Sequence, residues 1–300
     1  MIQGRTRPPL LASSLLLSVA VCLLGSTVRA DEPKPAATYE VETVADIPYY
    51  QGKDAHPLKH KLDLYLPKGK KDFPVLFFIH GGAWSIGDKS HFGLYSSIGR
   101  CFARQGIGVL VPNYRLSPTV THPGHIQDVA KAFAWTYKNI KKYGGRPDEI
   151  FVSGHSAGGH LAALLATDDT YLKAEGLSLK AIKGAIPLSG VYSIPEGGMF
   201  DKPFGKDPKA RKQASPINYV RGDAPPFLIV YGDADLPACD RPAACAFCKA
   251  LKDKKCQAEV LEVKNRNHMT ILFGAGSVKD PVGKAMLAFI QKHLSTAKGE

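Results

Sequence analysis

A serine between two glycines stands where a predicted strand passes into a predicted helix, in residues 149–169, EIFVSGHSAGGHLAALLATDD. Gly154 and Gly158 flank Ser156, and Gly159 follows directly. Glycines at these positions permit a very tight turn, because they remove the Cβ atoms that would clash where strand and helix pass. With a strand before it and a helix after it, Gly-x-Ser-x-Gly is typical of a nucleophile elbow, which holds a serine hydroxyl above a sheet.

Strands and helices alternate along the rest of the chain. Apolar or alternating runs predict strands at 39–44, 60–67, 74–80, 106–114, 149–154, 181–190, 225–232 and 257–263. Helical patterns occupy 90–104, 125–144, 157–168, 241–253 and 281–295. This alternation predicts an α/β fold, with a mostly parallel, twisted sheet flanked by helices in a single domain at 39–300.

A segment rich in Gly, Pro and Lys at 191–220 interrupts this alternation. A connection of that length between two core strands predicts a lid-like segment or a binding loop, and a plain surface excursion is the alternative.

The first thirty residues resemble a secretory leader. Two arginines precede an apolar run at 10–24, and Val-x-Ala at 28–30 precedes an aspartate. The run is shorter than the roughly 20 residues of a membrane-spanning helix, so a membrane anchor is the weaker interpretation. We therefore predict a signal peptide at 1–30, cleavage near Ala30, a tether at 31–38, and a secreted or periplasmic protein without stable membrane insertion.

Cysteines are unusually dense near the C-terminus. Cys22 lies within the predicted leader and raises the alternative of a lipoprotein, although Val21 is a poor residue before a lipidated cysteine. Four of the remaining five cysteines fall within eighteen residues: Cys239, Cys245, Cys248 and Cys256. In an exported chain this density predicts one or two disulfides, whose pairing the sequence does not fix.

A four-cysteine zinc site is the alternative, but one Cys-x-x-Cys pair is weak support for it, and we predict no metal and no cofactor. Cys101, in an apolar helical pattern, is expected to be a free buried thiol.

A serine hydroxyl requires a general base. Three histidines follow Ser156 in the sequence. His160 and His293 fall within predicted helices, whereas His268 falls in a predicted loop after a strand. Because catalytic groups in such folds stand on loops at the carboxyl ends of strands, His268 is the predicted base.

The base in turn requires an acid that orients it, and this acid is expected between the serine and the histidine in the chain. The loop after the strand at 225–232 offers Asp233 and Asp235. Asp235 is preferred because it lies further past the strand end, with Asp233 as the alternative, and helix capping is the structural interpretation of both.

An oxyanion hole would complete the site. His80-Gly81-Gly82-Ala83 follows an early buried strand, where such folds place backbone N–H groups that face the substrate carbonyl. We predict N–H donors at Gly81, Gly82 and Ala157.

Four further residues are predicted to face a substrate, with simple packing as the alternative: Trp84, Tyr192, Met199 and Phe200. His155 and His160 are expected to pack beside the elbow. Asp128 is expected on a helix surface, paired with Arg115.

These motifs resemble, in the same order, those of α/β-hydrolases of the carboxylesterase group, which includes hormone-sensitive-lipase-like esterases, kynurenine formamidases and acetyl-xylan and feruloyl esterases. The matching stretches are HGGAWSIGD (80–88), NYRLSP (113–118), GHSAGGHLAA (154–163), FGKDPKARKQASPINYV (204–220), YGDADLP (231–237) and NHMT (267–270). The resemblance implies a Ser156 nucleophile, an Asp235 acid, a His268 base, and oxyanion donors at Gly81, Gly82 and Ala157.

The chain departs from that pattern at three places. Ala83 replaces the third glycine of the lipase-type run, and His155 stands where the hormone-sensitive-lipase-like branch has aspartate, which favours the formamidase and acetyl-xylan esterase branch. The cysteine-rich stretch at 238–256 is unusual and puts transfer of nearby substrate contacts in doubt.

The expected function is hydrolysis of short-acyl esters through an acyl-enzyme, with a small molecule or a polysaccharide-linked ester as the substrate. The alternatives are an arylformamidase-type amide hydrolase and a catalytically silent binding protein on the same scaffold. The formal charge of +12 is spread over short lysine clusters without a nucleic-acid-binding motif, so no nucleic-acid partner is predicted.

Overall fold

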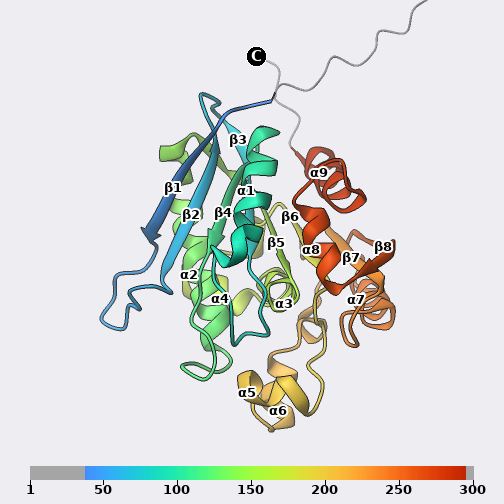
Figure 1. Cartoon of the computed structure of the whole chain (residues 1–300). Coiled ribbons are helices and arrows are strands. Elements are labelled where there is room, and N and C mark those ends of the chain that lie inside the picture. The colour runs from blue at the N-terminus through green and yellow to red at the C-terminus, as the bar shows by residue number, and fades with distance from the viewer. Residues whose placement is uncertain (1–37, 295–300) are drawn as a thin grey trace, which may run out of the picture. The chain divides into compact units, whose positions relative to one another are not determined.

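The apolar runs form one eight-stranded sheet in a computed structural model that describes residues 38–294 (Figure 1). The strands lie in the order β1-β2-β4-β3-β5-β6-β7-β8. β2 pairs antiparallel with both β1 and β4, and every pairing from β4 to β8 is parallel. The strands are β1 (Val41–Pro48), β2 (Lys61–Pro67), β3 (Phe73–Ile79), β4 (Gly108–Pro112), β5 (Gly145–His155), β6 (Gly184–Leu188), β7 (Phe227–Ala234) and β8 (Ala258–Asn267). The predicted mostly parallel α/β fold is confirmed.

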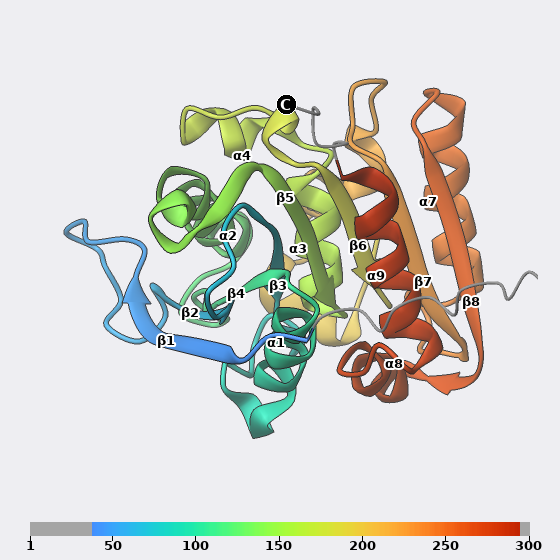
Figure 2. The same ribbon diagram turned by 90° about the horizontal axis from the view of Figure 1, so that it is seen from above.

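Helices cover both faces of this sheet, and Figure 2 shows α1, α8 and α9 along one side and α2 and α3 along the other. The helices are α1 (Leu94–Arg104), α2 (Gly124–Asn139), α3 (Ala157–Leu165), α4 (Asp169–Ala174), α5 (Asp201–Phe204), α6 (Pro208–Gln213), α7 (Arg241–Asp253), α8 (His268–Ala275) and α9 (Pro281–His293). Within residues 38–294, no helix has the length and apolar character needed to cross a bilayer.

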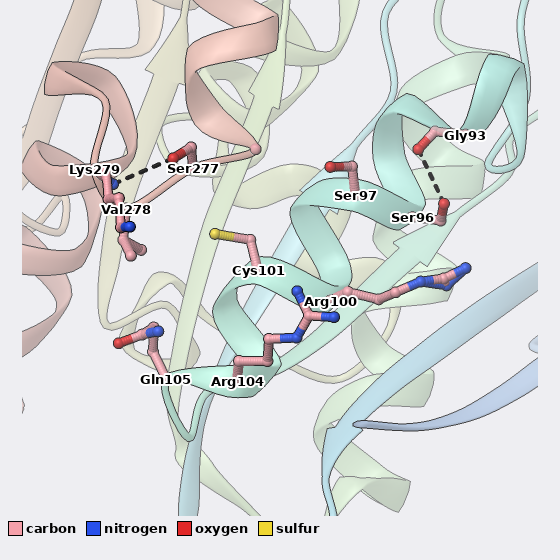
Figure 3. Close-up of a pocket in the computed structure, with 11 residues that line it drawn as sticks. Gly93, Ser96, Ser97, Arg100, Cys101, Arg104, Gln105, Ser277, Val278 and Lys279 are labelled. Atoms are coloured by element: carbon pink, nitrogen blue, oxygen red, sulfur yellow. Dashed lines mark hydrogen bonds between the residues drawn. The ribbon is translucent and has the colours of Figure 1, made fainter. Parts of the chain in front are cut away.

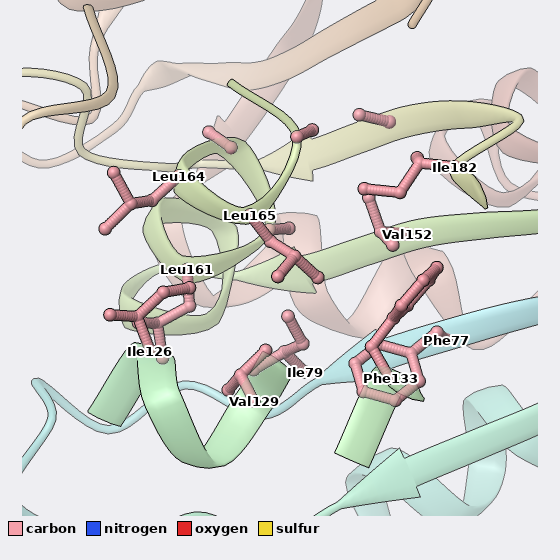
Figure 4. Packing of buried hydrophobic residues seen from close by; sticks show 14 of the residues in the cluster. Phe77, Ile79, Ile126, Val129, Phe133, Val152, Leu161, Leu164, Leu165 and Ile182 are labelled. Carbon is pink, nitrogen blue, oxygen red and sulfur yellow. The ribbon is translucent and has the colours of Figure 1, made fainter. Parts of the chain in front are cut away.

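Alternate side chains of β3 supply two separate hydrophobic cores. Phe77 and Ile79 face the core shared with α2 and α3, whereas Leu76 and Phe78 face the core shared with α1 and α9. Figure 4 shows the first core, where Phe77 meets Phe133 of α2 edge to face at 5.6 Å. Each fully buried side chain of this size contributes roughly 2–3 kcal/mol through the apolar area removed from water. The central strands that carry the predicted site are therefore held rigidly from both sides.

The segment at 191–220 folds into short helical turns and projects at the bottom of Figure 1, where α5 and α6 are drawn in yellow. Arg211 is buried at its centre. Its guanidinium donates hydrogen bonds to the carbonyls of Pro195 and Gly205 and to the Asp201 carboxylate. The segment is therefore braced from within by one buried cation.

Asp128 pairs with Arg115 as expected, but it is fully buried in α2, where the sequence suggested a surface position. Its carboxylate accepts hydrogen bonds from the Arg115 backbone N–H at 2.9 Å and from the guanidinium at 2.8 and 2.7 Å, and His60 Nε2 lies 3.2 Å away. Burial alone would raise the pKa of Asp128, but His60 and Arg115 hold it at about 2. Removing one partner of such a pair costs about 3–5 kcal/mol, so the pair fixes the loop after β4 against α2.

The five described cysteines are all free thiols, so the predicted disulfides are wrong for this structure. Cys245 is exposed on α7 while Cys248 is buried beneath it, so these two neighbouring cysteines do not face each other. The four C-terminal cysteines also do not gather as a zinc site among the described residues. Cys101 is free, as expected, but only partly buried. The predicted leader at 1–30 and tether residues 31–37 lie outside the described part of the chain.

Candidate active site

Ser156 occupies the sharp turn between β5 and α3. Its φ and ψ are 58° and −118°, a backbone conformation that costs a non-glycine residue of the order of 1–3 kcal/mol. A Cβ on Gly158 would lie 2.1 Å from the Ile79 carbonyl oxygen, and one on Gly154 would lie 2.5 Å from the Gly158 oxygen. The two glycines therefore permit the contacts that maintain this turn. The Ser156 hydroxyl forms no hydrogen bond to any residue of the described chain and lines a cavity.

Asp235 and His268 meet above the carboxyl ends of β7 and β8. His268 Nδ1 donates to Asp235 Oδ1 at 2.7 Å. The carboxylate also accepts from the Ser189 hydroxyl at 2.5 Å, and from the N–H groups of Gly232 at 3.0 Å and Leu236 at 2.8 Å. Burial alone would raise the pKa of Asp235, but hydrogen bonds from His268, Ser189 and Gly232 lower it below its usual value. The carboxylate therefore stays ionised and fixes the orientation of the His268 ring. Ser189 was not identified from the sequence.

Asp233, the alternative acid, lies elsewhere. Its side chain is exposed and accepts a hydrogen bond from the Arg266 backbone N–H at 3.0 Å. The structure therefore brings Asp235, and not Asp233, to the histidine.

His268 is the first residue of helix α8, whereas the sequence predicted a loop. Asn267 caps this helix, because its side chain accepts from the N–H groups of Met269 and Thr270 while the Thr270 hydroxyl accepts from the Asn267 N–H. This capping box fixes the backbone that carries His268.

His155 joins the elbow to the same backbone. Its Nε2 donates to the His268 carbonyl at 2.8 Å, and the two rings lie 4.5 Å apart between centroids. Burial and the neighbouring His268 lower the pKa of His155 to about 3, so the ring is neutral and can donate to a carbonyl. His155 does pack beside the elbow, and it also holds the position of His268.

The predicted oxyanion loop lies against the elbow. A Cβ on Gly81 would approach the His155 carbonyl oxygen to 2.8 Å and the Ser156 Cβ to 3.4 Å. However, the Gly81 N–H donates to the Tyr95 hydroxyl at 2.9 Å, which is at odds with its predicted role as an oxyanion donor. Tyr95 lies in α1, fourteen residues away, and no sequence signal linked it to this loop.

The N–H groups of Gly82, Ala83 and Ala157 have no acceptor among residues 38–294. Ala157 is the first residue of α3, where backbone N–H groups lack an intrahelical partner. Gly82 has φ of 115°, and a Cβ there would meet the Ile86 carbonyl oxygen at 2.1 Å. The structure thus adds Ala83 to the two predicted donors that remain free.

Trp84 connects this loop to the elbow helix. Its Nε1 donates to His160 Nδ1 at 3.1 Å, and His160 Nε2 donates to the Ala214 carbonyl at 2.7 Å. Burial lowers the pKa of His160 to about 3, which keeps its ring neutral. One chain of hydrogen bonds therefore joins the oxyanion loop, α3 and the 191–220 segment.

Ser156 opens into a cavity of about 360 Å³. Trp84, Met199 and Phe200 line it, as the sequence analysis expected of substrate-facing residues. Residues not identified from the sequence complete the wall: Ala83, Val191, Glu196, Gly197, Gly198, Leu236, Pro237 and Cys239.

Tyr192 does not belong to that wall, contrary to the prediction. It is buried, and its ring stacks on Phe247 of α7 at 4.4 Å with an interplanar angle of 4°. This stacking turns Tyr192 toward a different cavity, between the 191–220 segment and α7.

A third cavity, of about 420 Å³, lies between α1 and the loop at 276–279 (Figure 3). Arg100, Arg104 and Lys279 line it together with Cys101, and Ser156 does not. Its volume exceeds that of the Ser156 cavity, but no histidine, aspartate or glutamate is among the residues that line it.

One group of potential metal ligands is found among the described residues, formed by Asp235, Cys239 and His268. It coincides with the histidine–carboxylate pair.

Comparisons with known proteins agree with this geometry. Residues 62–239 match the family described as BD-FAE. Among curated proteins, esterase LipQ of Mycobacterium tuberculosis is 35% identical over 257 residues, which cover 79% of this chain and 59% of LipQ. Isoprenylcysteine α-carbonyl methylesterase ICME of Arabidopsis thaliana is 31% identical over 255 residues, which cover 75% of this chain and 56% of ICME. The chain therefore spans less than two thirds of the length of these relatives.

Solved structures show the same fold. A truncated carbohydrate esterase from gut microbiota superposes with a TM-score of 0.71 at 23% identity, covering 87% of this chain and 98% of that one. Esterase B from Lactobacillus rhamnosis superposes with a TM-score of 0.69 at 25% identity, covering 88% of this chain and 87% of that one. Because the family match extends over more than half of this chain, the chain belongs to the BD-FAE family, and its fold is that of the α/β-hydrolases.

Proposed function

We propose that this protein is a serine carboxylesterase that hydrolyses short-acyl esters through an acyl-enzyme. The observation that carries the proposal is the elbow, where Ser156 is held at φ of 58° at the mouth of a cavity while Asp235 orients His268 nearby. The curated relatives LipQ and LipC, both named esterases, support the reaction class.

The mechanism follows from the positions of these groups. His268 accepts the Ser156 hydroxyl proton as the serine oxygen attacks the ester carbonyl, and the N–H groups of Gly82, Ala83 and Ala157 stabilise the resulting oxyanion. His268 then donates the proton to the departing alcohol. Water then attacks the acyl carbonyl while His268 takes a proton from it. His268 returns this proton to the departing Ser156 oxygen, which releases the carboxylic acid and restores the serine. The ionised Asp235 stabilises the imidazolium that forms in both halves.

The cavity favours a short acyl group. Trp84 meets Phe200 at 5.9 Å and Phe204 at 4.8 Å between ring centroids, so aromatic side chains close one end. An added methylene that meets such a wall changes kcat/KM by about 10- to 200-fold.

The natural substrate in this proposal is a small ester or an ester carried on a polysaccharide, outside the cytoplasm. The apolar leader motif at 1–30 supports export, and an exported esterase can reach polymers too large to import. The structural similarity to a carbohydrate esterase supports an acylated carbohydrate as the class to test. Nucleic acid is not part of the proposal.

Hydrolysis of p-nitrophenyl esters of increasing acyl length tests this function. We expect the highest kcat/KM between acetate and butyrate, and a loss of at least about tenfold by octanoate, because the longer chain meets the aromatic wall. N-formyl anilides serve as the matched amide substrates. Faster turnover of the formanilide than of the acetate ester would instead establish an arylformamidase, and an absence of both activities would favour a silent binding protein.

A further inference from the structure

Cys239 places a thiol beside the histidine–carboxylate pair. One donor atom each from Cys239, Asp235 and His268 lies within 4.8 Å of the other two. Cys239 is 5% exposed and lines the cavity into which Ser156 opens. A small ion can therefore reach this thiol through the substrate cavity.

A tight turn creates this arrangement. The Cys239 N–H donates to the Leu236 carbonyl at 3.0 Å, and Ala238 adopts a left-handed φ of 69°. The turn directs the chain back toward the acid before α7 begins. Asp240 then caps α7, accepting from the Ala243 N–H. The turn before Cys239 and the helix cap after it therefore fix the position of this thiol relative to Asp235.

The protonation state of Cys239 excludes a role as a nucleophile or as a redox-active thiol. Burial and the Asp235 charge raise the pKa of Cys239 to about 12, so the group is a thiol that neither attacks nor oxidises readily. A metal ion can nevertheless displace the thiol proton, because metal binding couples to ligand deprotonation.

Sulfur, imidazole nitrogen and carboxylate oxygen are the ligands of zinc-type ions. Bonds of about 2.0–2.3 Å place tetrahedral ligand atoms roughly 3.3–3.8 Å apart. The three donors lie within 4.8 Å of one another and reach that spacing through shifts of about 1 Å. The fourth position would face the cavity and hold water. A thiol disfavours the hard ions Mg²⁺ and Ca²⁺, which take oxygen ligands.

We propose that Cys239, Asp235 and His268 form an inhibitory site for soft divalent ions such as Zn²⁺ and Cd²⁺. The inhibitory consequence rests on the proposed esterase function. Binding releases the thiol proton and engages one ring nitrogen of His268. If the metal binds Nδ1, the ring proton moves to Nε2, so the Asp235 hydrogen bond is lost and Nε2 has no lone pair left to receive the Ser156 proton. If it binds Nε2, the lone pair that would receive the Ser156 proton is consumed. Either geometry removes the general base.

The other C-terminal cysteines provide the control. Cys245 is exposed on α7 and belongs to no three-ligand group among the described residues. Cys245→Ser and Cys239→Ser therefore make the same chemical change, one outside the site and one within it.

The experiment titrates metal-free protein with Cd²⁺ and follows two signals, the ultraviolet thiolate-to-metal absorption and the hydrolysis of p-nitrophenyl acetate. Each variant is normalised to its own metal-free activity. We expect Cd²⁺ to inhibit the parent and the Cys245→Ser variant alike, EDTA to restore activity, and Cys239→Ser to weaken both signals at least about tenfold. Mg²⁺ at the same concentrations should not inhibit the parent.

Equal inhibition of the parent and Cys239→Ser, or inhibition by Mg²⁺ as strong as by Cd²⁺, would overturn the proposed site. Protein that binds Cd²⁺ through Cys239 but hydrolyses no ester without metal would instead contradict the esterase function, because the absorption signal needs no activity.

Discussion

Ser156→Ala is expected to lower kcat on p-nitrophenyl acetate by about 10⁶-fold, which leaves a residual acceleration of about 10³–10⁴-fold over the reaction in water. The reason is that the proposed reaction needs a covalent bond between the Ser156 oxygen and the acyl group. Alanine has no oxygen to attack the carbonyl, and only the residual acceleration from substrate binding and the oxyanion N–H groups remains. Serine and alanine both carry a Cβ, so the substitution should add no backbone strain at the positive φ of this position.

Ser97→Ala is the matched control for this measurement. Ser97 lies on α1 and lines the separate cavity of Figure 3, so its variant should retain the parent kcat. Circular dichroism of both variants should be unchanged. A Ser156→Ala protein that keeps more than about one hundredth of the parent kcat would contradict Ser156 as the nucleophile, since that residual rate exceeds what the remaining groups supply.

Asp235→Asn is expected to lower kcat by about 10⁴-fold, the second largest effect. An asparagine at this position can present its amide N–H₂ to His268 Nδ1 and so favour the wrong tautomer, in which Nε2 carries the proton. Such a ring cannot accept the Ser156 proton. The asparagine also lacks the negative charge that stabilises the imidazolium, although its side-chain oxygen can still accept the hydrogen bonds from Ser189 and Gly232.

Asp233→Asn is the control for this second prediction, because it makes the same change two residues earlier in the chain, near the end of β7. Asp233 is exposed and accepts one backbone hydrogen bond from Arg266, which an asparagine oxygen can also accept. Its kcat should stay within a few-fold of the parent. Steady-state kinetics of the two variants on p-nitrophenyl acetate decide the matter, and a large loss in Asp233→Asn with little loss in Asp235→Asn would reverse the assignment of the acid.

The sequence predicted the elbow well because its requirements are local. Gly154, Gly158 and Ser156 are fixed by close contacts within one strand–turn–helix unit, so their spacing alone carries the information. Asp235 and His268 could also be predicted from the sequence, since each follows a strand whose apolar run is easy to recognise. Parallel strands bring their carboxyl ends to one edge of the sheet, so the two side chains were expected to meet.

Contacts between distant segments were not predictable in the same way. The Gly81 N–H is satisfied by Tyr95, which comes from another element and belongs to no motif. Tyr192 was assigned to the substrate cavity from its position in the long 191–220 segment, but its stacking on Phe247 depends on where α7 packs. The cysteines show the same limit, because their density in sequence gave no information about which face of α7 each occupies.

Covalent labelling with an alkyl organophosphonate, followed by mass spectrometry of the digested protein, tests most directly whether Ser156 is an activated nucleophile. The account predicts one adduct per chain, located on Ser156, that forms with the loss of esterase activity and is absent from Ser156→Ala. Full labelling at another residue, or an unlabelled Ser156 in protein that hydrolyses esters, would contradict it.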